Sequence, residues 1–383
     1  MQKNLKILID ARVLSVQRGG VARIVINLLN EFSNRDKIQI ICLVMQGSST
    51  SLPQLKNVKY IYMSWPFGIK RFMRFFVENT KLYIQILKEK PDICFCPNYT
   101  APLLLYIYRP FKLVMGIWDI TYSTNPDHYT WYERLVLQFP SRIAARIADL
   151  VVTCSNFDAL QIQRYYKIDS KKIHVLKLNA DNIFFSEEYI EKPIKYLQNH
   201  EITDNYILSL GVIYKRRMIP EIVRAFVELK IERKLEESLQ LLIVGKNLIR
   251  PKFDLENLIS SSKMWGVRYI DFVPEEQLRA LFKFAQSYIC ISEVDGEAIL
   301  LKEAVALGTA VITTKMLSSD IDNHATLIKT PVTVDEIKSS ILRAIKTDSQ
   351  LLNKQAIKAK KKLTSISGET EYKKLAMAIL KEV

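Results

Sequence analysis

The chain is predicted to be an α/β protein made of two parallel-sheet domains. Short β-rich runs alternate with helical patterns from one end to the other, which is typical of parallel strands joined by crossover helices. The alternation stops at a polar, acidic stretch and then starts again. With 383 residues, of which 49% are hydrophobic, the chain is longer than one core usually organises and has ample apolar surface for two.

The first domain is predicted to span residues 1–183. Its helical patterns are Val21–Phe32, Thr80–Leu87 and Trp131–Ala148. A C-terminal helix at about residues 366–383 is expected to pack back on this domain. The β-rich runs are, in chain order, KILID, IQIICLVM, DICFCP, LVMGIWDI, LVVTCS and KIHVLKL.

Residues 184–204 are predicted to connect the two domains, because FFSEEYIEKPIKYLQNHEITDN is polar and acidic. The second domain is then expected over residues 205–365. Its β-rich runs are YILSLGVIY, LQLLIVG, VRYIDFV, SYICIS and TAVITT. Its helices are expected at Pro220–Lys230, Glu275–Ala285, Leu301–Leu307 and Val334–Ile345.

The cysteines and the N-terminus indicate a cytoplasmic protein. Four of the five cysteines lie in runs that resemble buried strands, which indicates reduced thiols. Cys94 and Cys96 have no second Cys/His cluster, so core packing is favoured over a metal site. The apolar run before Asp10 is too short for a signal peptide, and the apolar window Ala101–Trp118 is interrupted by basic residues and prolines, so we expect no membrane span.

The formal net charge of +15 indicates an acidic partner. The segment Phe67–Phe76 interleaves basic and apolar residues, as an interfacial membrane helix does, although a helix that packs its aromatics in the core has the same pattern. The lysines of Ala356–Leu363 are expected on a solvated helix face. Because the basic residues are spread over both halves and no recognition motif is present, we expect no nucleic-acid partner.

Polar residues that follow the predicted strands are the candidate ligand-binding groups, because open parallel sheets bind ligands beyond the carboxyl ends of their strands. Gly19 and Gly20 precede a helical run and can bring backbone N–H groups close to an anion. Arg216 and Arg217 follow YILSLGV and can clamp a diphosphate, although a solvated basic turn has the same composition.

The stretch SEVDGEAILLKEAVALGTAVI follows another predicted strand and carries two spaced carboxylates. Asp295 falls in a loop and Glu303 about one turn into a helix that begins near Ile299, so both can face a ligand at that helix start. A carboxylate pair there accepts hydrogen bonds from sugar hydroxyls. The alternative is that Glu303 caps the helix or forms a surface ion pair.

The order of these motifs resembles the retaining glycosyltransferases of family 4, which have the GT-B fold of two Rossmann-like domains facing each other across a cleft. The resemblance runs from about Lys6 to Ile345 and is most specific from Val267 to Ile312. The motifs that carry it are DAR with GG, PNYTAP, IWDI, VVTCSNF, KIHVLKLNAD, YILSLGVIYKRR, LLIVG, VRYIDFVPEEQLRALFKFAQSYICIS and DGEAILLKEAVALGTAVI.

The resemblance implies a role for each matching residue. Glu303 would hold the nucleotide ribose and Asp295 would orient the donor sugar. Catalytic roles are implied for Asp295, Arg216, Arg217 and Asp119. The implied donor-binding residues are Gly19 and Gly20 at the diphosphate, Lys246, Phe272 and Val273 near the nucleobase, and Gly296, Glu297, Ala298, Ile299 and Glu303 at the acidic loop.

The implied reaction is transfer of a hexose from a nucleoside-diphosphate sugar to a saccharide acceptor with retention, without a metal or other cofactor. GDP-mannose or a rhamnose donor is our guess for the donor. A lipid-linked acceptor, such as a polyprenyl-diphosphate saccharide, would place the protein at the inner face of the plasma membrane in O-antigen or capsule synthesis. The Asp320–Asp322 stretch has the D-x-D pattern of a metal site but is expected to be an ordinary loop.

Val212 stands where arginine or threonine is common in the family, and three further positions also depart from the family pattern. Trp118 stands where many members have histidine, and it can stack on a sugar ring. Asp295 replaces glutamate, and Glu297 adds negative charge where a diphosphate would lie. Together they leave open an alternative, a catalytically degenerate GT-B protein that binds a nucleotide sugar or acts as a partner subunit.

Overall fold

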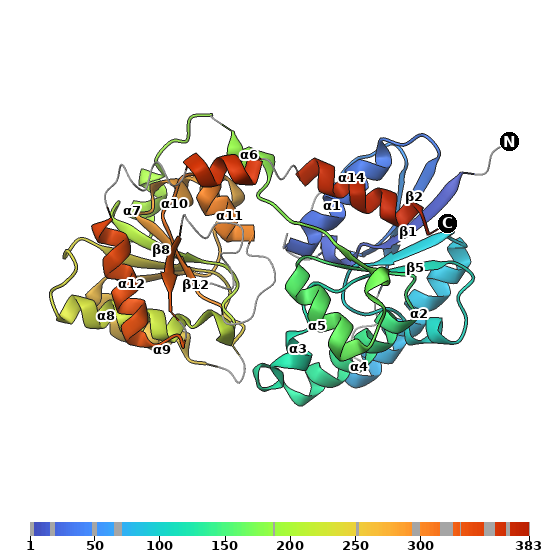
Figure 1. The fold of residues 1–383 in the computed structure, drawn as a ribbon, viewed down its shortest axis with the longest axis horizontal. Coiled ribbons are helices and arrows are strands. Elements are labelled where there is room, and N and C mark those ends of the chain that lie inside the picture. The colour runs from blue at the N-terminus through green and yellow to red at the C-terminus, as the bar shows by residue number, and fades with distance from the viewer. Residues whose placement is uncertain are drawn as a thin grey trace. The chain divides into compact units, whose positions relative to one another are not determined.

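The chain folds as two compact units in a computed structural model (Figure 1). One unit is Met1–Lys177 together with Glu369–Val383, and the other is Leu178–Gly368. The residues that the structure describes are 4–15, 20–47, 52–64, 71–186, 188–249, 253–292, 299–314, 325–329, 331–347, 357–364 and 368–382.

The first unit is built on a seven-stranded parallel sheet with the order β3-β2-β1-β4-β5-β6-β7. The chain moves outward from β1 to β3, returns to β4 on the other side of β1, and continues to β7. This reversal creates a topological switch point between β1 and β4, where doubly wound sheets bind ligands. The strands are β1 (Leu5–Asp10), β2 (Ile38–Met45), β3 (Val58–Met63), β4 (Ile93–Cys96), β5 (Lys112–Gly116), β6 (Leu150–Thr153) and β7 (Ile173–Val175).

Helices cover both faces of this sheet. The apolar sides of α2, α4 and α5 share one core with strand residues such as Leu8 and Met115, and Figure 1 shows α1 and α14 on the opposite face. Helix α4 begins where it does because Thr130 and Glu133 form a capping box. The helical segments are η1 (Arg12–Ser15), α1 (Gly20–Ser33), α2 (Arg71–Glu89), η2 (Leu103–Tyr106), α3 (Thr121–Thr124), η3 (Pro126–His128), α4 (Trp131–Ile147), α5 (Asn156–Tyr166), η4 (Ser170–Lys172) and α14 (Gly368–Leu380).

The second unit has a six-stranded parallel sheet with the order β10-β9-β8-β11-β12-β13. Its switch point lies between β8 and β11, and the loops that follow these two strands therefore start side by side. Strand interiors such as YILSL and QLLIV are almost continuously apolar because helices cover both faces. The strands are β8 (Tyr206–Leu210), β9 (Gln240–Val244), β10 (Val267–Ile270), β11 (Ser287–Cys290), β12 (Val311–Thr314) and β13 (Ala325–Ile328).

The helices of the second unit fall into two groups. Helices α8, α9 and α12 share a core with one face of the sheet. Helices α10 and α11 pack on the other face together with Phe184 and Leu197. These two residues belong to the stretch 184–204, so that stretch contributes to the core of the second unit. The helical segments are α6 (Asn182–Phe185), α7 (Ile194–Asn199), η5 (Lys215–Arg217), α8 (Ile219–Ile231), α9 (Leu255–Ser262), η6 (Lys263–Trp265), α10 (Glu275–Phe284), α11 (Ile299–Ala306) and α12 (Val334–Lys346).

The alternation predicted from the sequence is confirmed. The described residues add elements that were not predicted, among them the strands β3 and β13, the helices α5 and α9, and the short helices α3, α6 and α7. Strand β3 was missed because VKYIYM is an edge strand with one face half exposed, which weakens its apolar signal. Helix α2 is longer than the predicted Thr80–Leu87 and begins at Arg71. It therefore includes the basic, aromatic part of Phe67–Phe76, of which residues 67–70 lie outside the described part.

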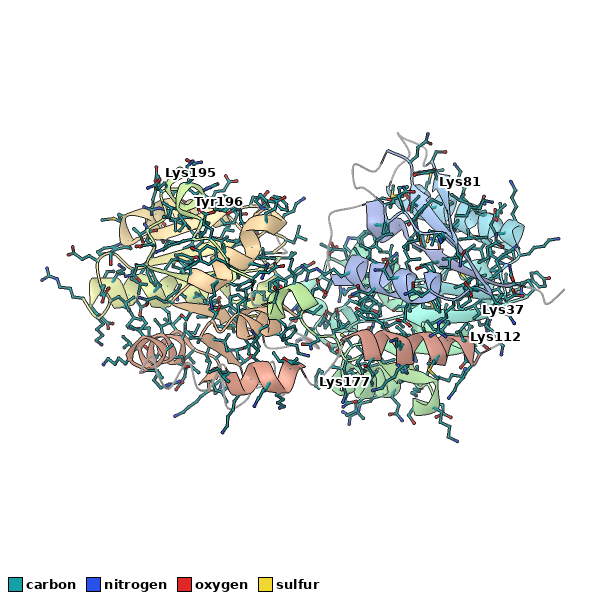
Figure 2. The ribbon with its side chains drawn as sticks, turned by 90° about the horizontal axis from the view of Figure 1, so that it is seen from above. Lys37, Lys81, Lys112, Lys177, Lys195 and Tyr196 are labelled. Carbon is teal, nitrogen blue, oxygen red and sulfur yellow. The ribbon has the colours of Figure 1, made fainter. Side chains whose placement is uncertain are left out.

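The positive charge is distributed over both units. Lys37, Lys81 and Lys112 lie exposed on the first unit, and Lys195 lies exposed on the second (Figure 2). A protein dedicated to nucleic-acid binding would gather its charge on one face or along one helix. Because the charge is spread over both units, the arginines at the sheet edges are the better candidates for binding an acidic ligand.

Candidate functional site

The carboxyl edge of the second sheet gathers the residues predicted to bind the donor. Because all its strands are parallel, the loops after β10, β9, β8 and β11 leave the sheet on the same edge. Arg216 and Arg217 follow β8, Lys246 follows β9, and Phe272 follows β10. The fold therefore brings residues that are far apart in the sequence to one edge.

The two arginines of this edge lie in the short turn η5 between β8 and α8. Nη1 of Arg217 donates a hydrogen bond to Sγ of Cys290, the last residue of β11, across 2.9 Å. The guanidinium of Arg216 lies 4.6 Å from the centre of the Tyr214 ring, a cation–π distance. Both arginines are half-buried, which contradicts the alternative of a solvated basic turn.

Glu303 lies in α11 and its side chain is fully buried, so it does not form the surface ion pair that the sequence left open. Its neighbour Lys302 is also buried and donates from Nζ to the carbonyl oxygen of Leu178 across 2.8 Å, which ties α11 to the start of the second unit. A buried carboxylate is costly to desolvate, and proteins keep such groups where they are paired or used.

Tyr288 shows that Arg217 and Glu303 belong to one electrostatic cluster. Burial raises the pKa of the Tyr288 hydroxyl well above its ordinary value, and the charge of Glu303 raises it further while that of Arg217 opposes the rise. The hydroxyl donates to the carbonyl oxygen of Leu210, the last residue of β8, across 2.9 Å. An arginine from the loop after β8 and a glutamate from the helix after β11 thus act on the same buried group.

A contact between two glycines shapes this edge, and the sequence analysis missed it. Gly211 follows β8 with φ of +130°, and Gly245 follows β9 with φ of +135°. A Cβ atom on Gly245 would overlap the carbonyl oxygen of Gly211, so only glycine permits this approach. The available signal was the recurrence of glycine directly after an apolar strand, in LSLG and LIVG.

A pocket opens at the switch point between β8 and β11. Its wall includes Arg217 and Cys290, the two ends of the hydrogen bond across the switch point. The pocket is lined by Ser209, Leu210, Gly211, Val212, Ile213, Arg217, Ile219, Ile289, Cys290 and Ile291.

The residues predicted near the nucleobase lie farther along the same edge. The carbonyl oxygen of Lys246 accepts a hydrogen bond from the amide of Ile213 across 3.0 Å, which joins the loops after β9 and β8. The Lys246 side chain is exposed. Phe272 is 60% exposed and Val273 is half-buried against the core. Phe272 is thus an exposed aromatic residue at this edge, and its contact with a nucleobase stays a prediction.

Part of the predicted site lies outside the described residues. These residues are Asp295, Gly296, Glu297 and Ala298 before α11, Gly19 before α1, and the Asp320–Asp322 stretch after β12. The neighbouring positions are described: Ile299 is the first residue of α11, and Gly20 is the first residue of α1. Their predicted donor contacts stay predictions.

The first unit places Asp119 just beyond the carboxyl end of β5. Oδ1 of Asp119 accepts from the amide and hydroxyl of Thr121 at 2.9 and 2.6 Å, and Oδ2 accepts from the hydroxyl of Tyr99 at 3.1 Å. Burial raises the pKa of Tyr99 well above its ordinary value, and the Asp119 charge raises it further. The carboxylate is therefore fixed in orientation at the edge of this sheet.

The sequence suggested that Trp118 could stack on a sugar ring, but Trp118 does not present a ring face for such stacking. It is only 6% exposed, and its indole Nε1 donates to the carbonyl oxygen of Pro97 across 2.7 Å. The ring packs against Gly116, where an added Cβ would come within 2.6 Å of it. Trp118 is a packing residue that supports the loop holding Asp119.

A buried ion pair at the switch point of the first sheet was also missed. Asp10 ends β1 and is fully buried, and Arg12 donates to its two oxygens from Nε at 2.6 Å and Nη2 at 2.7 Å. Burial alone would lower the pKa of Arg12, but the Asp10 carboxylate more than offsets this and the pKa is raised. An acidic residue that ends an apolar run, two positions before an arginine, was the available signal.

Two further properties bear on the class of protein. No cluster of three or more His, Cys, Asp or Glu side chains suited to a metal ion occurs among the residues that the structure describes. In the same part of the chain, no helix combines the length and the apolar character needed to cross a bilayer.

Two sequence profiles match the chain, one for each unit. The profile described as "Glycosyltransferase Family 4" matches residues 18–177, and the one described as "Glycosyl transferases group 1" matches residues 194–363. The chain is also similar to the O-antigen chain mannosyltransferase B of Escherichia coli, with 23% identity over 259 residues. That match covers 66% of this chain and 65% of the relative, so the chain spans slightly less than two thirds of it.

Solved structures agree with the fold. The sucrose-phosphate synthase of Thermosynechococcus elongatus matches with a TM-score of 0.77 at 13% identity, covering 99% of both chains. WaaG, a glycosyltransferase involved in lipopolysaccharide biosynthesis, matches with a TM-score of 0.75 at 14% identity, covering 98% of this chain and 99% of its own. The chain has two Rossmann-like units, and a glycosyltransferase profile matches each of them. This chain therefore has the GT-B fold and belongs to glycosyltransferase family 4.

Proposed function

We propose that this chain transfers a hexose from a nucleoside-diphosphate sugar to a saccharide acceptor with retention of configuration at the anomeric carbon. The observation that carries the proposal is the cluster at the second switch point, where Arg217 reaches Cys290, Glu303 is buried, and the charges of Arg217 and Glu303 act in opposite directions on the pKa of Tyr288. Cations suit a diphosphate, and a buried carboxylate suits the hydroxyls of a ribose.

The arginines would act on the leaving group. As the glycosyl bond breaks, the bonding electrons pass to the diphosphate, and negative charge develops on its oxygens. Arg216 and Arg217, already half-buried and oriented, would stabilise that charge without reorganising. The acceptor proton would pass to a leaving phosphate oxygen, so no protein base would be needed. The two arginines would take the place of a divalent ion at the diphosphate. Asp295 would orient the sugar, and Asp119 would face the acceptor side.

The donor is proposed to be GDP-mannose, with a rhamnose donor as the second choice. The name of the Escherichia coli relative, an O-antigen chain mannosyltransferase, supports mannose and supports a role in cell-surface polysaccharide synthesis. The acceptor is proposed to be lipid-linked, with a polyprenyl diphosphate as carrier. A cytoplasmic enzyme with such an acceptor would work on the inner face of the plasma membrane.

Membrane contact is proposed through Phe67–Phe76. Within its described part, Met73 is 58% exposed and Phe76 is 49% exposed, which supports a surface role for these apolar side chains. Flotation with anionic vesicles tests this, because Arg71→Glu with Arg74→Glu should reduce binding. Equal binding by the wild type and this double variant would remove the segment from the proposal.

The alternative is a degenerate GT-B protein that binds a nucleotide sugar without turning it over. Trp118 stands where many members of the family have histidine, and its burial is compatible with either function. Single-turnover chemical quench separates them. Transfer with retention supports the proposed enzyme, whereas nucleotide binding with no product supports the alternative.

The first test is the thermal stability of the protein with GDP, UDP, dTDP and ADP and their sugars, in the presence of a chelator. One nucleotide family should raise the midpoint, because a ligand at 100 times its Kd adds about 2.7 kcal/mol to the free energy of unfolding. Glu303→Gln keeps the size of the side chain but removes its charge, and it should reduce this stabilisation. A shift that appears only with an added divalent ion would contradict the metal-independent mechanism.

A further inference from the structure

Helix α4 carries an apolar stripe on its exposed side, in a unit whose core is already complete. Trp131 is 70% exposed, Leu135 is 49% exposed and Phe139 is 61% exposed. Residues four apart lie on the same side of a helix, so the three form a continuous row over the first half of α4. A surface helix normally turns such a row toward the core, and here the core is filled from the other side by Ala144 and Ala145.

The same row continues as a basic row in the second half of the helix. The structure describes α4 along its whole length, and its exposed residues after Phe139 are Arg142 and Arg146. No acidic residue of α4 is exposed, because Glu133 is half-buried in the capping box at the helix start. The exposed side of α4 is thus apolar and aromatic at one end and cationic at the other.

A second apolar element lies beside α4. The turn η2 contacts both α4 and α2, and the residues at its end are Tyr106, Ile107 and Tyr108. They are 68%, 78% and 58% exposed. The loop is held in place rather than loose, because Arg109 in the same loop donates to the carbonyl oxygen of Ile147 at the end of α4 across 2.6 Å.

Helix α2 also carries both apolar and basic residues on its exposed side. Met73, Phe76 and Ile84 are exposed, and so are Lys81 and Lys88. Lys81 points outward in Figure 2. Both α2 and α4 lie at the lower edge of the first unit in Figure 1 and meet at η2.

From these contacts we infer that α4 and the tip of η2 form a membrane-docking surface, which inserts apolar side chains among the headgroups of an anionic bilayer. Its residues are Trp131, Leu135, Phe139, Tyr106, Ile107 and Tyr108, with Arg142 and Arg146 as the cationic rim. The proposal rests on the proposed function for its purpose, which is to reach a lipid-linked acceptor, and it adds a contact that Phe67–Phe76 does not include.

The chemistry of the surface selects this occupant. Tryptophan and tyrosine concentrate at membrane–water interfaces because their rings are apolar and their N–H or O–H groups remain hydrated. Basic residues next to an inserted apolar face add attraction to anionic lipids, and the whole chain carries a net charge of +15. Two copies of such a surface would set Arg142 and Arg146 against like charges wherever the cationic ends met, which disfavours self-association.

Flotation of the full chain tests the surface. The probes are vesicles of phosphatidylcholine alone and of equal parts phosphatidylcholine and phosphatidylglycerol. The variant Trp131→Glu with Phe139→Glu should lower the partition coefficient for the anionic vesicles by at least about tenfold, because both substitutions place a carboxylate in the inserted row. The matched control is Tyr62→Glu with Met264→Glu, since these residues are 59% and 80% exposed and the charge change is equal.

The proposal is supported if the wild type and the control variant float with the anionic vesicles and the α4 variant stays in solution. It is overturned if the wild type does not float, or if the α4 variant floats as well as the wild type. It is also overturned if the wild type binds no vesicles but forms a concentration-dependent dimer, and the α4 variant does not form that dimer. In the supported case, Arg142→Glu should also weaken binding to the anionic vesicles. The difference from the wild type should be larger at low salt concentration.

The donor-induced thermal shift keeps this test separate from the proposed function. Trp131 and Phe139 belong to the first unit and the second switch point belongs to the second unit, so the α4 variant should keep the nucleotide shift of the wild type. A chain that floats without any nucleotide shift would contradict the proposed transferase and leave the docking surface standing. A nucleotide shift without flotation would do the reverse.

Discussion

Nη1 of Arg217 donates a hydrogen bond to Sγ of Cys290 across 2.9 Å, so a side chain from the loop after β8 is held at the end of β11. These strands are neighbours at the switch point of the second sheet, where the proposed donor diphosphate would lie. Cys290 is therefore proposed as a positioning residue, which acts through the arginine and does not itself touch the donor.

Replacing Cys290 with alanine should raise KM for the donor by about tenfold, because a hydrogen bond to a charged group contributes about 1.5–3 kcal/mol. Steady-state kinetics with varied donor concentration measures this. Cys290→Ser keeps an acceptor atom and should restore most of the affinity. If both variants lower the thermal midpoint equally and leave KM unchanged, Cys290 has a packing role only.

Gly245→Ala should destabilise the second unit by more than its unfavourable φ alone explains, because the new methyl group would overlap the carbonyl oxygen of Gly211. The matched control is Gly47→Ala. Gly47 also has a positive φ, of +82°, but a Cβ there meets nothing within 4 Å. Backbone strain alone costs on the order of 1–3 kcal/mol.

Urea unfolding of the two glycine variants gives the comparison. The loss for Gly245→Ala should exceed that for Gly47→Ala, and the nucleotide-induced shift should fall as well, since Gly211 belongs to the pocket lining. Equal losses would mean that the loops after β8 and β9 separate easily, and that their close approach does not shape the site.

The sequence predicted which residues form the edge of the second sheet, because parallel strands end together and ligand-binding residues follow them. Arg217 and Glu303 could be named in this way without knowing the strand order. The order β10-β9-β8-β11 could not, since it depends on which apolar runs pair over long separations and not on any local pattern.

Contacts between side chains were the least predictable level. The burial of Trp118 depends on the space left at Gly116 and on the carbonyl oxygen of Pro97, which no periodicity encodes. Polar residues next to apolar strand runs had a local signal that was overlooked, as for Asp10 and Arg12. A charged residue at the end of a buried strand requires a partner, and a nearby residue of opposite charge is the first to consider.

Asp10→Asn should destabilise the first unit by about 3 kcal/mol, because it weakens a bidentate ion pair whose carboxylate is fully buried. A second substitution, Arg12→Gln, should recover part of that loss, since it removes the charge that Asp10 neutralises. Chemical unfolding of the single and double variants measures both effects.

An ion pair at the surface provides the control for Asp10. Nζ of Lys192 donates to Oδ2 of Asp204 across 2.8 Å, but the Asp204 side chain is 71% exposed. Asp204→Asn should cost less than about 1 kcal/mol, because exposed pairs are screened by water and salt. A cost for Asp10→Asn as small as this one would mean that water reaches the buried pair.

His174 should make the first unit less stable as the pH falls below about 6.5, the ordinary pKa of histidine. His174 lies in β7, and burial lowers its pKa in the folded protein. Two groups on α14 act against each other on the ring: the Glu371 carboxylate raises the pKa, and the Lys374 ammonium, paired with Glu371 at 2.7 Å, lowers it.

The sign follows from which state of the protein binds the proton. Between the lowered pKa and about 6.5, the unfolded chain holds a proton on His174 that the folded chain does not, so acidification favours unfolding. His174→Gln cannot titrate, and its free energy of unfolding should therefore change less with pH over this range than that of the wild type. Urea unfolding at pH 5.0, 6.0 and 7.5, values chosen to bracket the titration, measures the difference. A wild type whose stability rises toward pH 5.0 relative to the variant would mean that Glu371 controls the titration and not burial.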